Sequence, residues 1–274
     1  MTTQAKTISE CGSCATSCNT AHLTKLGIKT GGWDYVVALA GNPNTGKSTI
    51  FNRLTGLHQH VGNWAGKTVT RAEGAFTLNE KKYKLVDLPG TYSLLSTSVD
   101  EEIARDFVLF GKPDVTIVVA DATRLERNLN LVLQILEITD RAVVALNLID
   151  EARRANLTID ERALARDLGV PVVPMSARRG EGVTELLNAV ESVAEGKFPA
   201  RAHRIKYADE KLEKAIETLA AELRAEFADL PNARWVALRL LEGDESIIKA
   251  VRLNQLGTVK EAGIFPSLVQ IEAN

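Results

Sequence analysis

The chain has 274 residues, 45% apolar and 25% charged, with a net charge of −2, which suits one large domain or a medium and a small one. The near-neutral balance excludes a general attraction to nucleic acid, which needs a basic face. Apolar runs far shorter than the roughly 18 residues of a membrane span, and a start without the apolar core of a secretory signal, predict a soluble cytosolic chain.

All three cysteines lie near the start, in "CGSCATSCN", as Cys11, Cys14 and Cys18, and His22 follows them. A reducing cytosol favours metal binding or redox chemistry over a structural disulfide. In one straight helix, Cys11 and Cys18 would be about 10.5 Å apart along the axis, too far for thiolates that share one zinc. A turn at Gly12 would let these side chains close around zinc or an iron–sulfur cluster. Three interpretations stay open: a metal or cluster site, redox-active thiols, or a tail with neither function.

From Tyr35 to about Val193, short β-branched runs alternate with longer amphipathic stretches, as in a mostly parallel sheet with crossover helices. The six expected strands are residues 35–40, 67–78, 82–87, 114–121, 142–147 and 170–176. After "GKFPARAHR", apolar residues recur at helical spacing, at Leu212, Ile216, Leu219, Leu223 and Phe227 and then in "ARWVALRLLEG" and "ESIIKAVRL". We expect an N-terminal extension over 1–34, an α/β domain over 35–198 and a small all-α domain over 199–274.

The stretch "GNPNTGKS", residues 41–48, matches the phosphate-binding pattern G-x-x-x-x-G-K-[ST] and lies between an expected strand and an expected helix. Its glycines let backbone N–H groups turn toward phosphate oxygens, and the helix N-terminus adds positive potential. Lys47 would bridge the β- and γ-phosphates, and Ser48 would bind Mg²⁺. The expected nucleotide contacts in this loop are Asn42, Asn44, Thr45, Gly46, Lys47, Ser48 and Thr49.

A second motif, "DLPG" at residues 87–90, ends a later strand. There the Asp87 carboxylate would hold the water shell of Mg²⁺, and the Gly90 N–H would reach the γ-phosphate. Taken alone this motif is only a turn. Its place at the carboxyl end of a strand, where open α/β sheets bind ligands, supports a nucleotide site.

Two more motifs indicate guanine as the base. In "NLID", Asn147 and Asp150 match an N-x-x-D pattern whose carboxylate accepts hydrogen bonds from the guanine N1–H and exocyclic amine, a donor pair that adenine lacks. In "SAR", the Ala177 N–H would meet the guanine O6, with Ser176 and Arg178 beside it. Four motifs in this order predict GTP binding.

Several stretches together resemble the N-terminal cytosolic part of the bacterial ferrous-iron transporters of the FeoB family: "GNPNTGKSTIFNRLTG", "HVGNWAGKTV", "VDLPGTYSL", "ATRLERNLNLVLQILE" and "ALNLID". "RWVALRLLEGD" resembles that family's helical domain, described as a guanine-nucleotide dissociation inhibitor. The resemblance covers about residues 35–274. It implies a Ras-like P-loop GTPase domain and a helical domain at the cytoplasmic face of the bacterial inner membrane. We expect a soluble fragment whose partner is the membrane-spanning part of the transporter; whether it forms a homo-oligomer stays open.

The resemblance also implies roles for single residues. Thr68, in a first switch over residues 57–70, would close on Mg²⁺ and the γ-phosphate, and Asn44 would help to hold a K⁺ beside the phosphates. Such an ion would stabilise developing charge as an arginine finger does elsewhere. Thr91 stands where Ras-like enzymes carry a water-positioning glutamine, so hydrolysis is expected to be slow. The expected catalytic residues are Asn44, Lys47, Thr68 and Gly90.

The favoured function is a GTPase switch that regulates ferrous-iron transport, in which GTP orders residues 57–70 and 87–98 and the helical domain carries the change toward the membrane part. A ribosome- or RNA-associated assembly GTPase would share the sheet and motifs but calls for a basic RNA module. A third alternative is a nucleotide-sensing adaptor with negligible turnover.

Overall fold

The computed structural model describes most of the chain after the N-terminal extension. The described residues are 23, 26, 28, 32–56, 59–64, 67–95, 98–204, 207–227, 230 and 232–253. The predicted metal or cluster residues Cys11, Cys14, Cys18 and His22 lie outside them. None of the helices in the described ranges is both long and apolar enough to cross a bilayer.

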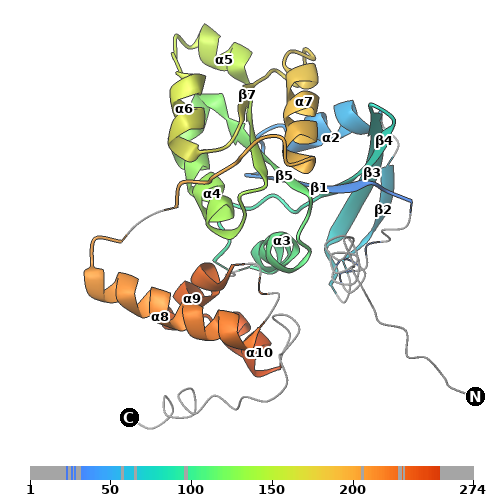
Figure 1. The fold of residues 1–274 in the computed structure, drawn as a ribbon. Helices are drawn as coiled ribbons and strands as arrows, with labels where there is room; N and C mark the ends of the chain where they lie inside the picture. Colours follow the sequence, from blue (N-terminus) through green and yellow to red (C-terminus); the bar gives the residue numbers. More distant parts are fainter. Residues whose placement is uncertain are drawn as a thin grey trace, which may run out of the picture.

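A mixed sheet forms the centre of the molecule (Figure 1), with strands in the order β2-β3-β4-β1-β5-β6-β7. The strands are β1 Tyr35–Gly41, β2 Gln59–Asn63, β3 Thr70–Leu78, β4 Lys81–Asp87, β5 Val115–Asp121, β6 Ala142–Asn147 and β7 Val172–Pro174. The five strands β4, β1, β5, β6 and β7 are parallel to one another. Strand β3 pairs with β4 in the antiparallel direction, and β2 pairs with β3 in the same way. All six expected strands are present, with ends shifted by a few residues.

The expected number of strands was wrong, because the described residues form seven. The additional strand, β2, lies inside the segment 57–70 that we expected to be a switch loop. Its sequence "QHVGN" contains Gly and Asn, which strands disfavour, so no local pattern indicates it. Antiparallel pairing with β3, from Gln59 opposite Gly74 to Asn63 opposite Thr70, makes it a strand at the sheet edge.

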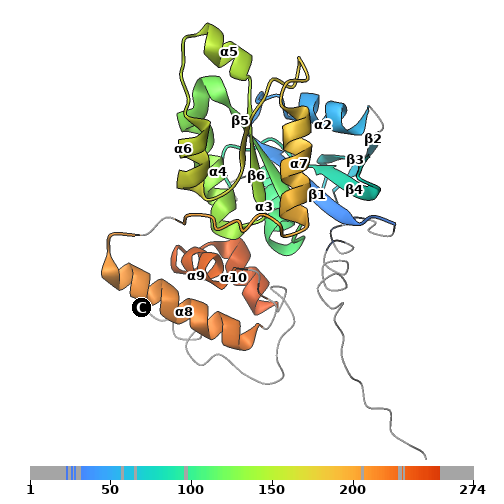
Figure 2. The same ribbon diagram turned by 45° about the horizontal axis from the view of Figure 1, so that its top comes forward.

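Helices cover both faces of the sheet (Figures 1 and 2). They are α2 Lys47–Thr55, α3 Val99–Phe110, the short 3₁₀ turn η1 Ala122–Arg124, α4 Leu125–Ile138, α5 Ile149–Arg154, α6 Glu161–Leu168 and α7 Val183–Ala194. Because side chains alternate along a strand, Val37 and Leu39 of β1 join one core with α2 and α7, and Val36 and Ala38 join another with α3 and α4.

The described part of the C-terminal segment forms three helices, as its apolar spacing predicts: α8 Glu210–Glu226, α9 Ala233–Leu241 and α10 Glu245–Arg252. Ile216 of α8, Trp235 of α9 and Ile247 of α10 are buried in the same cluster as side chains of α3 and α4. Arg234 donates two hydrogen bonds to the Glu213 carboxylate, at 2.8 and 2.9 Å, and so joins α9 to α8. The helical domain therefore shares one continuous apolar core with the sheet domain.

Asn232 makes a polar contact between the two domains. Its side-chain oxygen caps α9 by accepting from the Trp235 N–H at 3.0 Å. Its side-chain nitrogen donates to the carbonyl oxygens of Glu137 and, at 3.2 Å, Ile138, at the end of α4. One side chain thus begins a helix of the helical domain and occupies two end carbonyls of a sheet-domain helix.

We predict that Asn232→Ala lowers the free energy of unfolding by about 1–3 kcal/mol, because it removes a helix cap and leaves carbonyl oxygens without a donor. Asn232→Ser, which retains a capping oxygen but cannot reach α4, should lie between Ala and the parent chain. Urea unfolding of the three proteins measures the order. A parent-like midpoint for Asn232→Ala would refute the role.

Candidate functional site

The residues of "GNPNTGKS" form a loop from the end of β1 to the start of α2. Gly46 has a φ of +86°, and a Cβ there would overlap the side-chain nitrogen of Asn147, so only glycine fits. Asn44 also has a positive φ, +65°, which Asn tolerates better than most residues, and its side chain is exposed together with Ser48 and Thr49. The loop thus presents exposed polar side chains around the helix N-terminus.

The Asn147 side chain, at the end of β6, joins two loops of the site. Its nitrogen donates to the Thr45 carbonyl oxygen, and its oxygen accepts from the Ala177 N–H, each at 2.9 Å. Asn147 is 1% exposed, so both hydrogen bonds are shielded from water. The Ala177 N–H, expected to meet guanine O6, is therefore already paired with Asn147 in this structure.

Lys47 and Asp87 contact each other at the carboxyl ends of the neighbouring strands β1 and β4. The Lys47 Nζ lies 2.5 Å from Asp87 Oδ1, because β1 and β4 are neighbours with Leu39 opposite Asp87. Burial raises the pKa of Asp87 above its usual value, and the charge of Lys47 and its hydrogen bond partly offset this rise. The expected phosphate-binding cation and the expected Mg²⁺-binding carboxylate are thus side by side.

Asp150, in the first turn of α5, is held as a carboxylate. Partial burial acts to raise its pKa, but the hydrogen bond from Ser176 and the charges of Arg179 and Arg154 outweigh burial and lower that pKa below its usual value. The Asp150 Oδ2 lies 3.2 Å from Arg179 Nε and 3.3 Å from Arg154 Nη2. An ionised carboxylate is the acceptor that guanine recognition requires.

Arg53 is a positioning residue that the sequence motifs do not indicate. From the last turn of α2, it donates to the carbonyl oxygens of Ala177 at 3.1 Å and Arg178 at 2.8 Å. The helix that begins at the phosphate loop is thus also joined to the loop after β7. No local pattern could indicate this contact, because it joins residues more than 120 positions apart in the sequence.

The residues that follow "DLPG", 91–94, contact the end of β1 and helix α4. Thr91 is buried, and its N–H donates to the Gly41 carbonyl oxygen at 3.3 Å. Further along, the Leu94 N–H donates to Gln134 Oε1 at 2.6 Å, and the Arg127 guanidinium lies 4.3 Å from the centre of the Tyr92 ring. Gln134 and Arg127 both belong to α4, which therefore holds this segment from one face.

The segment expected to be the first switch contacts α3. Thr68, the expected Mg²⁺ ligand, is exposed, and the preceding Lys67 Nζ lies 2.8 Å from Glu102 Oε2. Trp64 is buried, with its ring centre 5.5 Å from that of Phe107 in an edge-on arrangement. In this structure the segment before β3 contacts α3, the helix that follows residues 87–98, which are the expected second switch.

A cavity of about 350 Å³ borders the phosphate loop. It is lined by residues of the loop, η1, α4 and α5, among them Asn42, Asn44, Tyr92, Arg127 and Leu148. The buried Asn42 amide has no hydrogen-bond partner among the described residues. Those residues also contain no group of three His, Cys, Asp or Glu side chains arranged to hold a metal ion.

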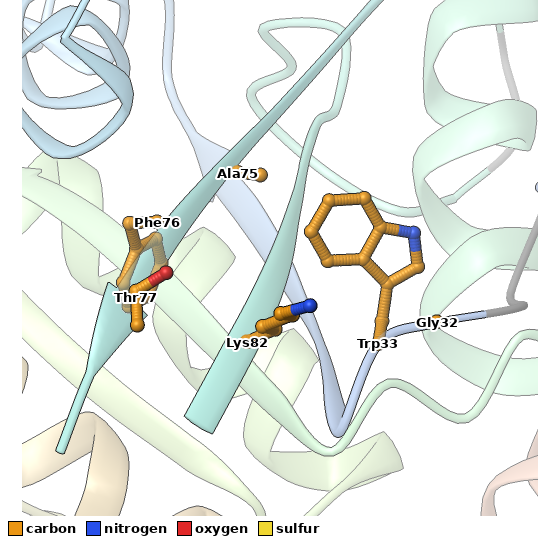
Figure 3. Close-up of a pocket in the computed structure, with 6 residues that line it drawn as sticks. All are labelled: Gly32, Trp33, Ala75, Phe76, Thr77 and Lys82. Carbon is orange, nitrogen blue, oxygen red and sulfur yellow. The ribbon is translucent and has the colours of Figure 1, made fainter. Parts of the chain in front are cut away.

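A second cavity, of about 480 Å³, lies at the opposite end of β4 from Asp87. Figure 3 shows the Trp33 indole beside the end of β4 that carries Lys82, with Phe76 and Thr77 on the neighbouring strand. None of the expected nucleotide residues lines this cavity. The cavity beside the phosphate loop is therefore the better candidate site.

Comparison with known proteins agrees with this geometry. The family model described as "Ferrous iron transport protein B" matches residues 35–190, and that of the "FeoB cytosolic helical domain" matches residues 209–264. The Fe(2+) transporter FeoB of Shigella flexneri is 44% identical over 212 residues, which are 76% of this chain and 27% of that protein. This chain thus spans about a quarter of the length of that relative.

Solved structures of FeoB cytosolic domains share the fold. That of T. maritima in a GDP form is 40% identical with a TM-score of 0.73, covering 83% of this chain and 89% of that one. That of L. pneumophila is 35% identical with a TM-score of 0.73, covering 81% and 86%. The α/β domain and the helices α8 to α10 are therefore the parts of one known architecture: the chain belongs to the FeoB family and carries its P-loop GTPase fold and its cytosolic helical domain.

Proposed function

We propose that this chain binds and slowly hydrolyses GTP, and so regulates ferrous-iron transport by a membrane-spanning part of the same transporter. The two hydrogen bonds of the Asn147 side chain carry the proposal. They join the phosphate loop to the loop after β7, at the carboxyl ends of the strands, where Lys47 also contacts Asp87. Family membership does not favour the alternative of an RNA-associated assembly GTPase. The proposed limits are 35–198 for the GTP-binding domain and 199–274 for the helical domain.

Guanine would be selected by Asp150, whose carboxylate accepts from the base N1–H and exocyclic amine. The Ala177 N–H, bonded to Asn147, would share its hydrogen with guanine O6, as bifurcated donors commonly do. Ser176 and Arg178 complete this end of the site. Asn42, Thr45, Gly46 and Thr49 would surround the phosphates from the loop and the first turn of α2.

The oxygen donors at the phosphate end suit Mg²⁺, which prefers hydroxyl, carboxylate and water oxygens. Ser48 is exposed at the start of α2, and Asp87 ends the neighbouring strand β4. These two residues would hold the ion, with Thr68 joining when the first switch closes. Bound Mg²⁺ would neutralise charge on the β- and γ-phosphates.

Catalysis would depend on groups that stabilise charge on the phosphates. Lys47 would move from Asp87 to the β- and γ-phosphates, the Gly90 N–H would reach the γ-phosphate, and the exposed Asn44 would hold K⁺. Thr91 occupies the position of a water-orienting glutamine, yet it is buried. The burial of Thr91 supports the proposal of slow hydrolysis, because a buried threonine would not orient an attacking water.

The N-terminal residues Cys11, Cys14, Cys18 and His22 remain a proposed zinc or iron–sulfur site, supported only by their spacing. The proposed location is the cytoplasmic face of the bacterial inner membrane, with the membrane-spanning part and a guanine nucleotide as partners. A homo-oligomer remains open, and nucleic acid is not a proposed partner.

We predict that phosphate release from GTP is faster in K⁺ than in Na⁺ by roughly tenfold or more, since one well-placed charge-stabilising group contributes at least this much. Asn44→Ala should remove the difference but retain GDP binding. Asn79→Ala is the matched control, since Asn79 also has a positive φ and lies in the turn between β3 and β4. Release no faster than without protein in either salt would contradict the enzyme assignment, and equal rates in both salts would contradict the K⁺ role.

We predict that Asp150→Asn lowers GTP affinity by roughly 10- to 100-fold, because two hydrogen bonds to a charged acceptor are lost. The amide donor should in turn favour xanthosine triphosphate, whose base has a carbonyl in place of the amine. Competition with a fluorescent nucleotide measures both affinities. Glu151→Gln removes a charge one position away and should leave the preference for guanine intact; a retained guanine preference in Asp150→Asn would refute the assignment.

A further inference from the structure

Helix α3 lies where both switches and the helical domain come together. It begins at Val99, directly after the second switch window, and Figure 1 shows it between the sheet and helices α9 and α10. Ile103 and Phe107 of α3 are buried in the apolar cluster that also contains Val236 of α9. A displacement of α3 would therefore change the packing of side chains in both domains.

Arg105, on α3, is a buried cation shared between the domains. It is 2% exposed, and its guanidinium lies 2.7 Å from Asp106 Oδ1 on its own helix. On the other side it donates to Ser246 Oγ at 2.8 Å and lies 3.6 Å from Asp244 Oδ2. Asp244 also caps α10 by accepting from the Ser246 and Ile247 N–H groups.

Separating this cluster would be costly, because a buried charge that loses one partner is left without compensation for its lost hydration. Arg105 therefore couples the position of α3 to the first turn of α10. The planar guanidinium, which fixes the directions of its donors, makes this coupling geometric as well as electrostatic.

Helix α3 also contacts the first switch, through residues on either side of Arg105 in the sequence. Glu102 pairs with Lys67 at 2.8 Å, and Phe107 contacts the buried Trp64 ring. The Lys67 N–H donates to the Trp64 carbonyl oxygen at 3.0 Å, so these two residues are also joined to each other. Thr68 follows directly, and its closure on a nucleotide would pull on Lys67 and, through the contact with Glu102, on α3.

The junction leaves room for such a movement. A cavity of about 700 Å³ lies between the second switch and the helical domain, lined by Leu95, Glu102, Asp244, Ser246 and Lys249 among others. Packed interfaces usually change between discrete arrangements rather than deform continuously. Space at this contact allows α3 and α10 to shift together.

We propose that α3 is a tether between the first switch and the helical domain, with Lys67–Glu102 at one end and Arg105–Asp244–Ser246 at the other, so that switch closure on GTP displaces α10. The tether rests on the proposed GTP-binding function. It names the residues through which the nucleotide state reaches the C-terminal helices.

The direct test is hydrogen exchange of α10 amides in the complete chain, with GDP and with a non-hydrolysable GTP analogue. We expect the exchange rates to differ between the two nucleotides by about threefold or more, and Arg105→Lys to remove the difference. Arg239→Lys is the matched control: Arg239 lines the same cavity but pairs with Glu242 within the helical domain. Its nucleotide response should persist.

A second measurement holds even where Arg105→Lys fails to fold. Lys67→Met and Ser246→Ala, singly and together, form a double-mutant cycle on the ratio of GTP-analogue to GDP affinity. Distant independent sites give additive effects, so we expect a departure from additivity of about threefold or more. Additivity would overturn the tether, as would identical α10 exchange with both nucleotides bound. Failure to bind either nucleotide would instead overturn the proposed function itself.

Discussion

The paired hydrogen bonds of the Asn147 side chain are the constraint on which the site depends. The phosphate loop and the loop after β7 are more than 120 residues apart in sequence, and Asn147 joins them directly, while Arg53 joins the second loop to α2. Because Asn147 is buried, both hydrogen bonds form in a medium of low dielectric, where leaving either partner unpaired is costly. Gly46 allows this contact, since any side chain there would displace the Asn147 amide. Gly46 and Asn147 thus require each other.

Strand positions and the motif residues at the strand ends could be predicted from sequence, because alternation of apolar residues and loop chemistry are local properties. The limits of that prediction lie in contacts between distant segments. No local pattern indicates that "QHVGN" pairs with β3, that Arg53 bonds to the loop after β7, or that the Ala177 N–H is taken by Asn147. Lys67 and Trp64 likewise gave no local sign that both contact α3. Each of these depends on a partner that only the folded chain provides.

The helical domain is joined to the sheet domain by two kinds of contact with different consequences. The apolar core that runs from α4 to α9 is non-directional and tolerates small shifts, whereas the Asn232 cap and the Arg105 cluster fix particular atoms. The helices of the two domains can stay packed together while they shift along each other, provided that the polar groups at the interface exchange partners together. Burial of the charged cluster makes partial rearrangements costly, which favours two well-defined arrangements over a continuum.

The proposed first switch contains a strand of the sheet, β2. Residues 59–63 are part of the sheet, so any movement that draws them toward the nucleotide first breaks a row of main-chain pairs with β3. Closure of the proposed switch would then require the ligand to compete with strand β3 for the backbone of β2. Strand stability, set by residues that never touch the nucleotide, becomes a means of adjusting how readily the protein responds, and conditions that weaken the sheet edge would make the switch more sensitive.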